Sequence, residues 1–465
     1  MRANLHLLTA ALIAVSSVVG CSDSGVKETP APTAPNPGVI TLGLVGSFAG
    51  GDGDVSNQVR LGAELAASQL NSVGGVLGRR VVLRIEDDNG VPATALQKIN
   101  QLIADGVTIG LGPTTSATAS AVLDLARSDK ILFISPSASS PALDLPELKG
   151  DRSVRANLLR TVPSDDLQAS AMVVVASQNR EQFAEDLTLK TGQARCSSAI
   201  LVYQKDAYGS PIYERALKRL LDYNVSAARS VELSPLDLTE STLRGSAGQV
   251  ANAALSQNAN CQLVIAQPKI AGAYMRAFRN FISDPAIEVK RDWPSFTTLG
   301  SDGFTQDAFV TAGRTNPADP RSDTAGNGSV AVGANTRPQT QAFALFREAY
   351  RARNPGAEPG QFSSTAYDAV IMLGLAMEKA KTADNRPALR QSLYDLSIGE
   401  AVSPSDMVLL LGRVRAGVAI NYDGVSGGVD FLPTGAVDGS FVIGKVEKNH
   451  FVQFRKTLES SALPR

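Results

Sequence analysis

Two clusters of small hydroxyl side chains have the clearest capacity for binding chemistry in this sequence. They lie in LGPTTSATAS (111–120) and ISPSASSPAL (134–143), and each follows an apolar run typical of a buried strand. Both should therefore lie at the carboxyl ends of parallel strands, where open α/β sheets bind ligands. The alternative is that these Ser and Thr residues only cap the helices that follow them.

The sequence contains few residues and motifs of the kinds that form catalytic sites. The chain has two histidines, His6 and His450, so a metal site built on several imidazoles is excluded. GVSGG (424–428) matches G-x-S-x-G, but it lies in a Gly-rich turn without the strand–turn–helix context that a nucleophile elbow needs. GSFAGGDGD (46–54) lacks the pattern of a phosphate loop, and we interpret it as a loop at the mouth of a cleft. We expect no enzyme activity, no metal and no cofactor.

The amino terminus has the pattern of a lipoprotein signal. Residues 1–20 combine a positive start with an apolar core, and VVGC ends at Cys21, the expected lipidation site. Residues 21–38 are rich in proline and predict a semi-extended tether. The alternative is an ordinary signal peptide in which the cysteine is incidental. Because a serine follows Cys21, we expect attachment to the outer membrane if the host is Gram-negative.

Length and composition restrict the number of domains and the kinds of partner expected for the remaining part of the chain. About 425 residues are too many for one core and enough for two domains. The net charge is −1 and no basic patch is present, which argues against a nucleic-acid partner. Cys196 and Cys261 form an even pair in an oxidising compartment and stand just before two apolar runs, so we expect a disulfide if those strands are neighbours.

Strands and helices alternate along the body, which predicts doubly wound parallel sheets. The first half predicts strands at 39–48, 79–90, 107–113 and 130–136, with helices at 57–75, 91–106 and 117–129. The second half predicts strands at 197–204, 261–268 and 296–304, and helices at 165–178, 211–224 and 271–282. A polar surface loop (314–329), two amphipathic helices (340–353 and 364–381) and a strand-like run (440–447) follow.

The run from Leu70 to Val122 resembles the amino-terminal lobe of Leu/Ile/Val-type periplasmic binding proteins. That family carries Asn, Gly-Gly-x-x-Gly, a strand, an acidic pair and later Gly-Pro-x-x-Ser. The likeness continues in RTVPSDDLQASA (160–171), YQKDAYGSPIYERAL (203–217), LGSDGF (299–304) and STAYDAVIMLGLAME (364–378), and so covers most of residues 39–380.

The resemblance implies two α/β lobes joined by a three-strand hinge. The chain would cross between lobes near 161–163, near 332–336 and around 425–435. Residues 39–162 with 334–428 would then form lobe 1, and residues 163–333 with 429–465 would form lobe 2.

The resemblance also implies an amino-acid site. Hydroxyls at Thr115, Ser116, Ser137 and Ser139 would hold the carboxylate, with Ser139 in the family's Thr/Ser position. Asp302 would neutralise the ammonium, and Tyr208 and Tyr367 would line the cleft. Three positions depart from the family: Asp302 replaces a longer Glu, Val55 stands where a Tyr is usual, and residues 267–272 match poorly. The ligand's identity is therefore not determined by the resemblance.

The implied function is that of a lipid-anchored protein that captures a small polar ligand, an amino acid, for an ABC-type importer. The membrane contact would be made through the lipid, and the partner would be an ABC permease. The alternative on the same fold is a ligand-sensing or envelope-assembly lipoprotein without a transport role.

Overall fold

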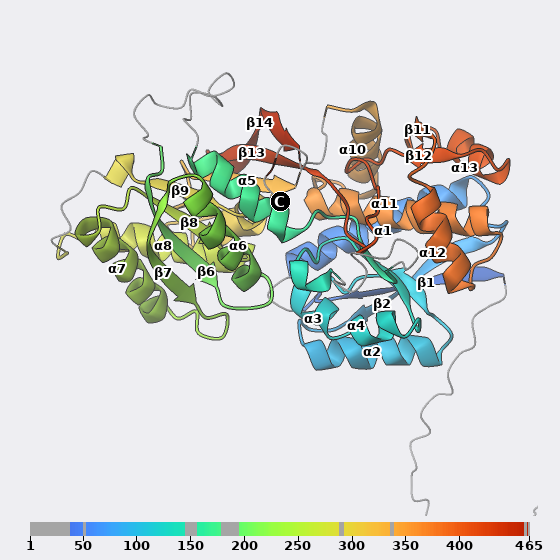
Figure 1. Cartoon of the computed structure of the whole chain (residues 1–465), viewed down its shortest axis with the longest axis horizontal. Coiled ribbons are helices and arrows are strands. Elements are labelled where there is room, and N and C mark those ends of the chain that lie inside the picture. The colour runs from blue at the N-terminus through green and yellow to red at the C-terminus, as the bar shows by residue number, and fades with distance from the viewer. Residues whose placement is uncertain are drawn as a thin grey trace, which may run out of the picture. The chain divides into compact units, whose positions relative to one another are not determined.

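The structure is a computed structural model (Figure 1) that describes residues 38–49, 53–144, 156–177, 195–287, 293–334, 339–459 and 463. The predicted signal peptide (1–20), Cys21 and the tether, apart from Gly38, lie outside the described residues. No helix in the described ranges is both long enough and apolar enough to cross a membrane.

The first lobe is built on a five-stranded, wholly parallel sheet. Its strand order is β2-β1-β3-β4-β5, with β1 (Val39–Gly46), β2 (Arg80–Asp87), β3 (Ile109–Leu111), β4 (Leu132–Ser135) and β5 (Leu158–Arg160). The central strands β3 and β4 are buried at every position, as their continuous apolar runs predict for a sheet covered on both faces.

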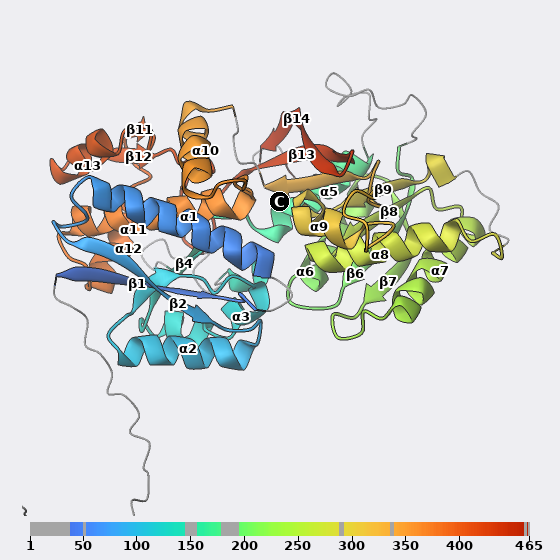
Figure 2. The ribbon, with the colours of Figure 1, turned by 180° about the vertical axis from the view of Figure 1, so that it is seen from behind.

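Helices cover both faces of this sheet. In Figures 1 and 2, α1 (Gly53–Ser72) and α11 (Gln361–Ala380) run side by side on one face, while α2 (Pro92–Ala104) covers the other. Helix α11 was expected to be amphipathic, but residues Phe362 to Glu378 are all buried. It is enclosed because α10 (Gln341–Arg353), α12 (Arg386–Asp395), α13 (Met407–Arg415) and the two-stranded sheet of β11 (Glu400–Val402) and β12 (Ile420–Tyr422) add to the same core.

The second lobe has a seven-stranded mixed sheet of order β14-β13-β10-β9-β8-β6-β7. Its parallel part contains β6 (Ser198–Gln204), β7 (Ser226–Leu233), β8 (Cys261–Ile265), β9 (Thr297–Gly300) and β10 (Val330–Ala334). Strands β13 (Ser440–Glu447) and β14 (His450–Glu459) then add an antiparallel edge, which the expectation of purely parallel sheets did not include.

Helices cover both faces of the second sheet. Helices α5 (Asp165–Ser177) and α6 (Gly209–Asp222) share one core, whereas α7 (Glu240–Ser256), α8 (Pro268–Ile282) and α9 (Asp307–Ala312) share another on the opposite face (Figures 1 and 2). Strands β6 and β8 pair in parallel with Ala199 opposite Cys261, and the predicted Cys196–Cys261 disulfide joins them.

The chain passes between the lobes three times. The first passage follows β5 and the second follows β10. The third comes later than the predicted boundary after residue 428, because Val429, Phe431 and Val437 pack in the core of the first lobe. Backbone pairing holds this segment there, since the Arg160 amide donates to the Gly435 carbonyl at 2.8 Å.

Three local predictions differ from the structure. The helix expected at 117–129 is two short helices, α3 (Ser116–Ser120) and α4 (Leu123–Arg127). Strand β7 and helix α7 were not predicted. Five of the eight residues of β7 are exposed because it is an edge strand, so its apolar pattern is weak.

Candidate ligand-binding cleft

A narrow cleft with a cavity volume of about 20 Å³, partly open to solvent, is lined by residues of both lobes. The first lobe contributes Val55, Thr114, Thr115, Ser116, Ser137, Ser139 and Phe362, and the second contributes Tyr208, Gln267, Pro268, Asp302, Gly303 and Gln306. Six of the seven predicted binding residues therefore line one space, although they are distant in sequence.

Thr115 has the capping role that was left open as the alternative for the hydroxyl clusters. It is the N-cap of α3, and its side-chain oxygen accepts a hydrogen bond from the Thr118 amide at 3.2 Å. Its neighbour Thr114 contacts the Ser56 hydroxyl at 2.8 Å within a buried polar network. Part of the first cluster therefore builds the wall of the cleft and satisfies the backbone at the start of a helix.

Ser116 and Ser137 offer different atoms to a ligand. The Ser116 oxygen accepts a hydrogen bond from the Ser140 amide at 3.2 Å, and no described residue accepts its hydroxyl hydrogen. In contrast, Ser137 donates its hydrogen to the Thr114 carbonyl at 2.7 Å. Ser116 can thus donate to an anion, whereas Ser137 presents only lone pairs in this arrangement.

A buried arginine holds the loop that carries Ser139. Arg160 at the end of β5 is 1% exposed, and its Nη1 donates to the carbonyls of Ser139 and Ser140 at 2.8 and 2.9 Å. Its Nη2 pairs with the Asp144 carboxylate. The guanidinium fork fixes the backbone of the second hydroxyl cluster at the cleft.

The opposite wall is acidic. Tyr208, the residue before α6, contacts the Asp302 carboxylate, and its hydroxyl lies 2.9 Å from the Ser301 hydroxyl. Burial raises the pKa of Asp302, and hydrogen bonds from Tyr208 and Gln168 partly oppose that rise. Burial and the nearby carboxylates raise the pKa of Tyr208 well above its usual value, which keeps it a neutral donor.

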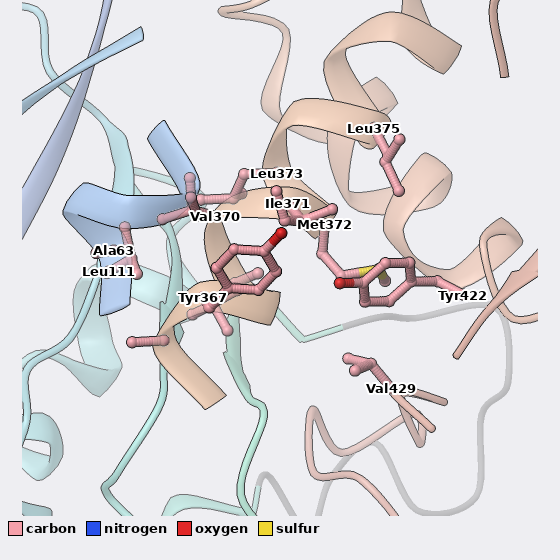
Figure 3. Packing of buried hydrophobic residues seen from close by; sticks show 14 of the residues in the cluster. Ala63, Leu111, Tyr367, Val370, Ile371, Met372, Leu373, Leu375, Tyr422 and Val429 are labelled. Atoms are coloured by element: carbon pink, nitrogen blue, oxygen red, sulfur yellow. The ribbon is translucent and has the colours of Figure 1, made fainter. Parts of the chain in front are cut away.

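The prediction that Tyr367 lines the cleft is wrong. Figure 3 shows Tyr367 among the core residues of α11; it is buried, its ring packs against Phe346, and its hydroxyl hydrogen-bonds Gln69 at 2.5 Å. Phe362, five residues earlier on the same helix, lines the cleft instead. The first turn of α11 reaches the cleft, and the following turns enter the core.

The Gly-rich turn at 424–428 has a structural role. The buried Asp368 carboxylate accepts hydrogen bonds from the Tyr422 hydroxyl at 2.6 Å and from the amides of Val425 and Ser426 at 3.0 and 2.7 Å. Burial raises the pKa of Asp368 to about 6, although these donors oppose the rise. Ser426 is thus held in a turn, as predicted, rather than at a nucleophile elbow.

Sequence reasoning missed several cleft residues. Gln306 follows the Asp302 turn, and its Oε1 accepts a hydrogen bond from Gln58 of the other lobe at 2.9 Å. Gln267 and Pro268 come from the 267–272 segment that matched the family poorly. Their position just after strand β8 was the available signal, because strand ends line the ligand crevice.

The arrangement suits reversible binding of a small molecule with opposite charges at its two ends. One wall presents the Ser116 hydroxyl as a donor, and the other presents the Asp302 carboxylate. Within the described ranges, no group of three His, Cys, Asp or Glu side chains is placed to hold a metal ion.

Comparison with known proteins agrees with the fold. The family model described as periplasmic binding protein matches residues 39–275, about half of the chain. The chain therefore belongs to the periplasmic binding protein family, whose members bind solutes outside the cytoplasm.

Among curated relatives, a Leu/Ile/Val-binding protein of Rhizobium johnstonii is 26% identical over 77% of this chain and 83% of its own length. Leu/Ile/Val-binding protein homolog 3 of Brucella melitensis is 23% identical over 84% of this chain and 89% of its own length.

Solved structures show the same fold. A leucine binding protein from Thermotoga maritima has a TM-score of 0.69 at 16% identity, over 91% of this chain and all of its own. A solute binding protein from R. palustris in complex with benzoate has a TM-score of 0.67 at 15% identity, over 92% of this chain and 97% of its own. One fold thus accepts an amino-acid binder and an aromatic-acid binder, so the ligand must be inferred from the side chains of the cleft.

Proposed function

We propose that this protein captures a free amino acid in the interlobe cleft and delivers it to an ABC-type importer. The observation that carries the proposal is the opposed chemistry of the two walls. Ser116 on lobe 1 has a hydroxyl hydrogen to donate, and Asp302 on lobe 2 supplies a buried negative charge across the same cleft.

In this proposal the α-carboxylate lies against the hydroxyl wall. Ser116 donates to it directly, Thr115 and Ser139 border it, and Ser137 supports the Thr114 carbonyl beneath it. The ammonium group lies against Asp302, with the Tyr208 hydroxyl beside it. A charge-assisted hydrogen bond at each end orients the ligand, and Val55 and Phe362 contact its side chain.

The relatives support this ligand class by their names, since the two Leu/Ile/Val-binding proteins match most of this chain. A transporter substrate binding protein from Streptococcus pneumoniae in complex with isoleucine shares the fold, with a TM-score of 0.65 at 17% identity. Ligand capture would close the lobes by shifting a hinge equilibrium, which is the ordinary mode of two-lobed binding proteins.

The proposal includes a lipid anchor at Cys21 that holds the protein on the outer face of a membrane, the outer membrane in a Gram-negative host. VVGC at the end of an apolar core and the Pro-rich segment after it support this placement. One acyl chain alone binds membranes weakly, so more than one is expected for stable attachment.

Thermal unfolding of residues 39–465 with each of the twenty L-amino acids tests the ligand class. A bound amino acid present at 100 times its Kd should stabilise the protein by about 2.7 kcal/mol and raise Tm. The decarboxylated and deaminated analogues of the best binder should each raise Tm less, because each lacks one charged end. A ligand that raises Tm equally without its amino group would contradict the proposal.

A further inference from the structure

A second carboxyl group lies close to Asp302 and was not predicted from the sequence. Asp165 begins α5, is 1% exposed, and its backbone amide donates to the Ser139 carbonyl at 2.9 Å. Its side chain hydrogen-bonds Ser139, a residue that lines the cleft, while its Oδ2 has no hydrogen-bond partner among the described residues. A buried carboxylate oxygen without a partner is costly, which points to a missing donor.

Resting on the proposed function, we infer that Asp165 is a further ligand-binding residue. Together with Asp302 it forms a two-carboxyl seat for one ammonium group of the ligand, and that group enters in exchange for a proton.

The charged groups around Asp165 and Asp302 explain why a proton would be exchanged for the ammonium group. Asp165 interacts with Asp302 and Tyr208 from the second lobe and with Arg160 and Ser139 from the first, while Gln168 hydrogen-bonds Asp302. Its neighbour Asp166 points to Arg215 at 3.0 Å, and Asp144, which is 17% exposed in its side chain, pairs with Arg160. Arg160 is the buried cation beside this pair, but it is shared with Asp144, so at least one of the two carboxyls lacks a full counter-charge among the described residues.

Two buried carboxyls that share one cation favour holding one proton between them. Burial and the neighbouring Asp302 charge raise the pKa of Asp165 well above its usual value. When an ammonium group binds, it supplies the second positive charge, so the shared proton leaves to solvent and both carboxylates accept N–H donors. No covalent bond forms, and the net charge of the seat is the same before and after binding.

Ligand-free protein gives the first test, with Asp165→Asn compared with the matched control Asp166→Asn. Both variants remove one acid from the first turn of α5, so the effect on the helix dipole is the same. At about pH 7, infrared spectra of the parent and of Asp166→Asn should show the carbonyl stretch of a protonated carboxylic acid, and Asp165→Asn should lose it. Retention of that band in Asp165→Asn would overturn the inference.

The stability of the ligand-free protein should depend on pH because of the same proton. The folded pKa of Asp165 is raised, so the folded state keeps a proton that the unfolded chain releases, and stability should fall as pH rises above about 4. Asp165→Asn should weaken this fall, and Asp166→Asn should keep it. If Asp165→Asn does not fold, Asp302→Asn removes the other carboxyl of the pair and gives the same test.

Calorimetry with each of the twenty L-amino acids, in two buffers of different ionisation enthalpy, tests the exchange itself. The parent and Asp166→Asn should release up to one proton per bound amino acid, and affinity should rise by up to about tenfold per pH unit. Asp165→Asn should release none. Equal release by Asp165→Asn, or none by the parent, would overturn the inference while leaving the amino-acid proposal intact.

If none of the twenty amino acids binds, the proposed function fails on its own. The proton count is then measured with methylammonium chloride, which carries the cationic group alone. Release of a proton on its binding supports the two-carboxyl seat, and binding without release overturns it.

Discussion

At the scale of single residues, the cleft separates groups that build it from groups that can meet a ligand. Thr115 caps α3 and Ser137 donates to a backbone carbonyl, whereas Ser116 keeps a donor hydrogen and Asp302 keeps a buried charge. Hydroxyls can serve both roles because each carries one donor and two acceptor positions.

This separation predicts unequal costs at the two ends of the ligand. Ser116→Ala removes one hydrogen bond to a charged group, so affinity should fall by about 1.5–3 kcal/mol. Asp302→Ala truncates one partner of a buried, hydrogen-bonded charge pair with the ammonium, so affinity should fall by about 2–5 kcal/mol. Calorimetry with the amino acid that gives the largest thermal shift measures both. An Asp302→Ala variant that binds as well as the parent would rule out the assignment.

At the scale of elements, the first lobe depends on the close approach of α1 and α11. Gly62 of α1 lies against the backbone of α11, and a Cβ at Gly62 would stand 2.0 Å from the Ser363 carbonyl oxygen. The contact brings Val55 and Phe362, at the starts of the two helices, to the same cleft.

Gly62→Ala should therefore destabilise the protein, because the two helices must move apart. We expect a loss of about 1–3 kcal/mol in the free energy of unfolding, as for other overpacked sites, measured by urea denaturation. Gly245→Ala in α7 is the matched control, since nothing lies within 4 Å of its Cβ position. Alanine there should stabilise by about 0.5–1 kcal/mol through helix propensity. Loss of stability in both variants would show that packing at Gly62 is not the cause.

The disulfide links two neighbouring strands of the second sheet. Cys196 and Cys261 are separated by 65 positions and tie the starts of β6 and β8, which are neighbours in the sheet. Replacing both by Ser should lower the free energy of unfolding by about 3–5 kcal/mol, because the unfolded chain regains the entropy of a long loop.

Urea denaturation of the double Ser variant against the parent measures this loss. A thiol titration of the unfolded, unreduced parent checks the bond directly, and it should find no thiol from either residue. A double variant as stable as the parent would exclude a stabilising role.

At the scale of the whole molecule, the proposed lipid anchor would determine on which membrane surface the protein works. We predict that Cys21→Ala, which removes the proposed acylation site, releases the protein from the envelope. Fractionation without detergent is the measurement, and the parent should stay with the membranes. If the variant still pellets with the envelope, the lipoprotein assignment is wrong.

Local patterns in the sequence predicted the alternation of strands and helices and the disulfide between neighbouring strands, whereas the family resemblance implied the two lobes and the residues expected at the cleft. Continuous apolar runs and strand-end hydroxyls carry that information because side-chain periodicity and strand ends have the same meaning in every parallel sheet. Tyr367 and Asp165 show what local patterns leave open. Both lie within family-like segments, yet Tyr367 points into the core and Asp165 lies beside the cleft.

Only the tertiary structure decided those two positions. The part of α11 that reaches the cleft depends on how α1 and three further helices enclose α11. The interaction of Asp165 with Asp302 joins residues that are 137 positions apart in the sequence. The third crossing, which comes only after Val437, is of the same kind, because backbone pairing with β5 holds residues 429–437 in the first lobe. Contacts between distant segments carry no local sequence signal, and so they appear only when the chain is folded.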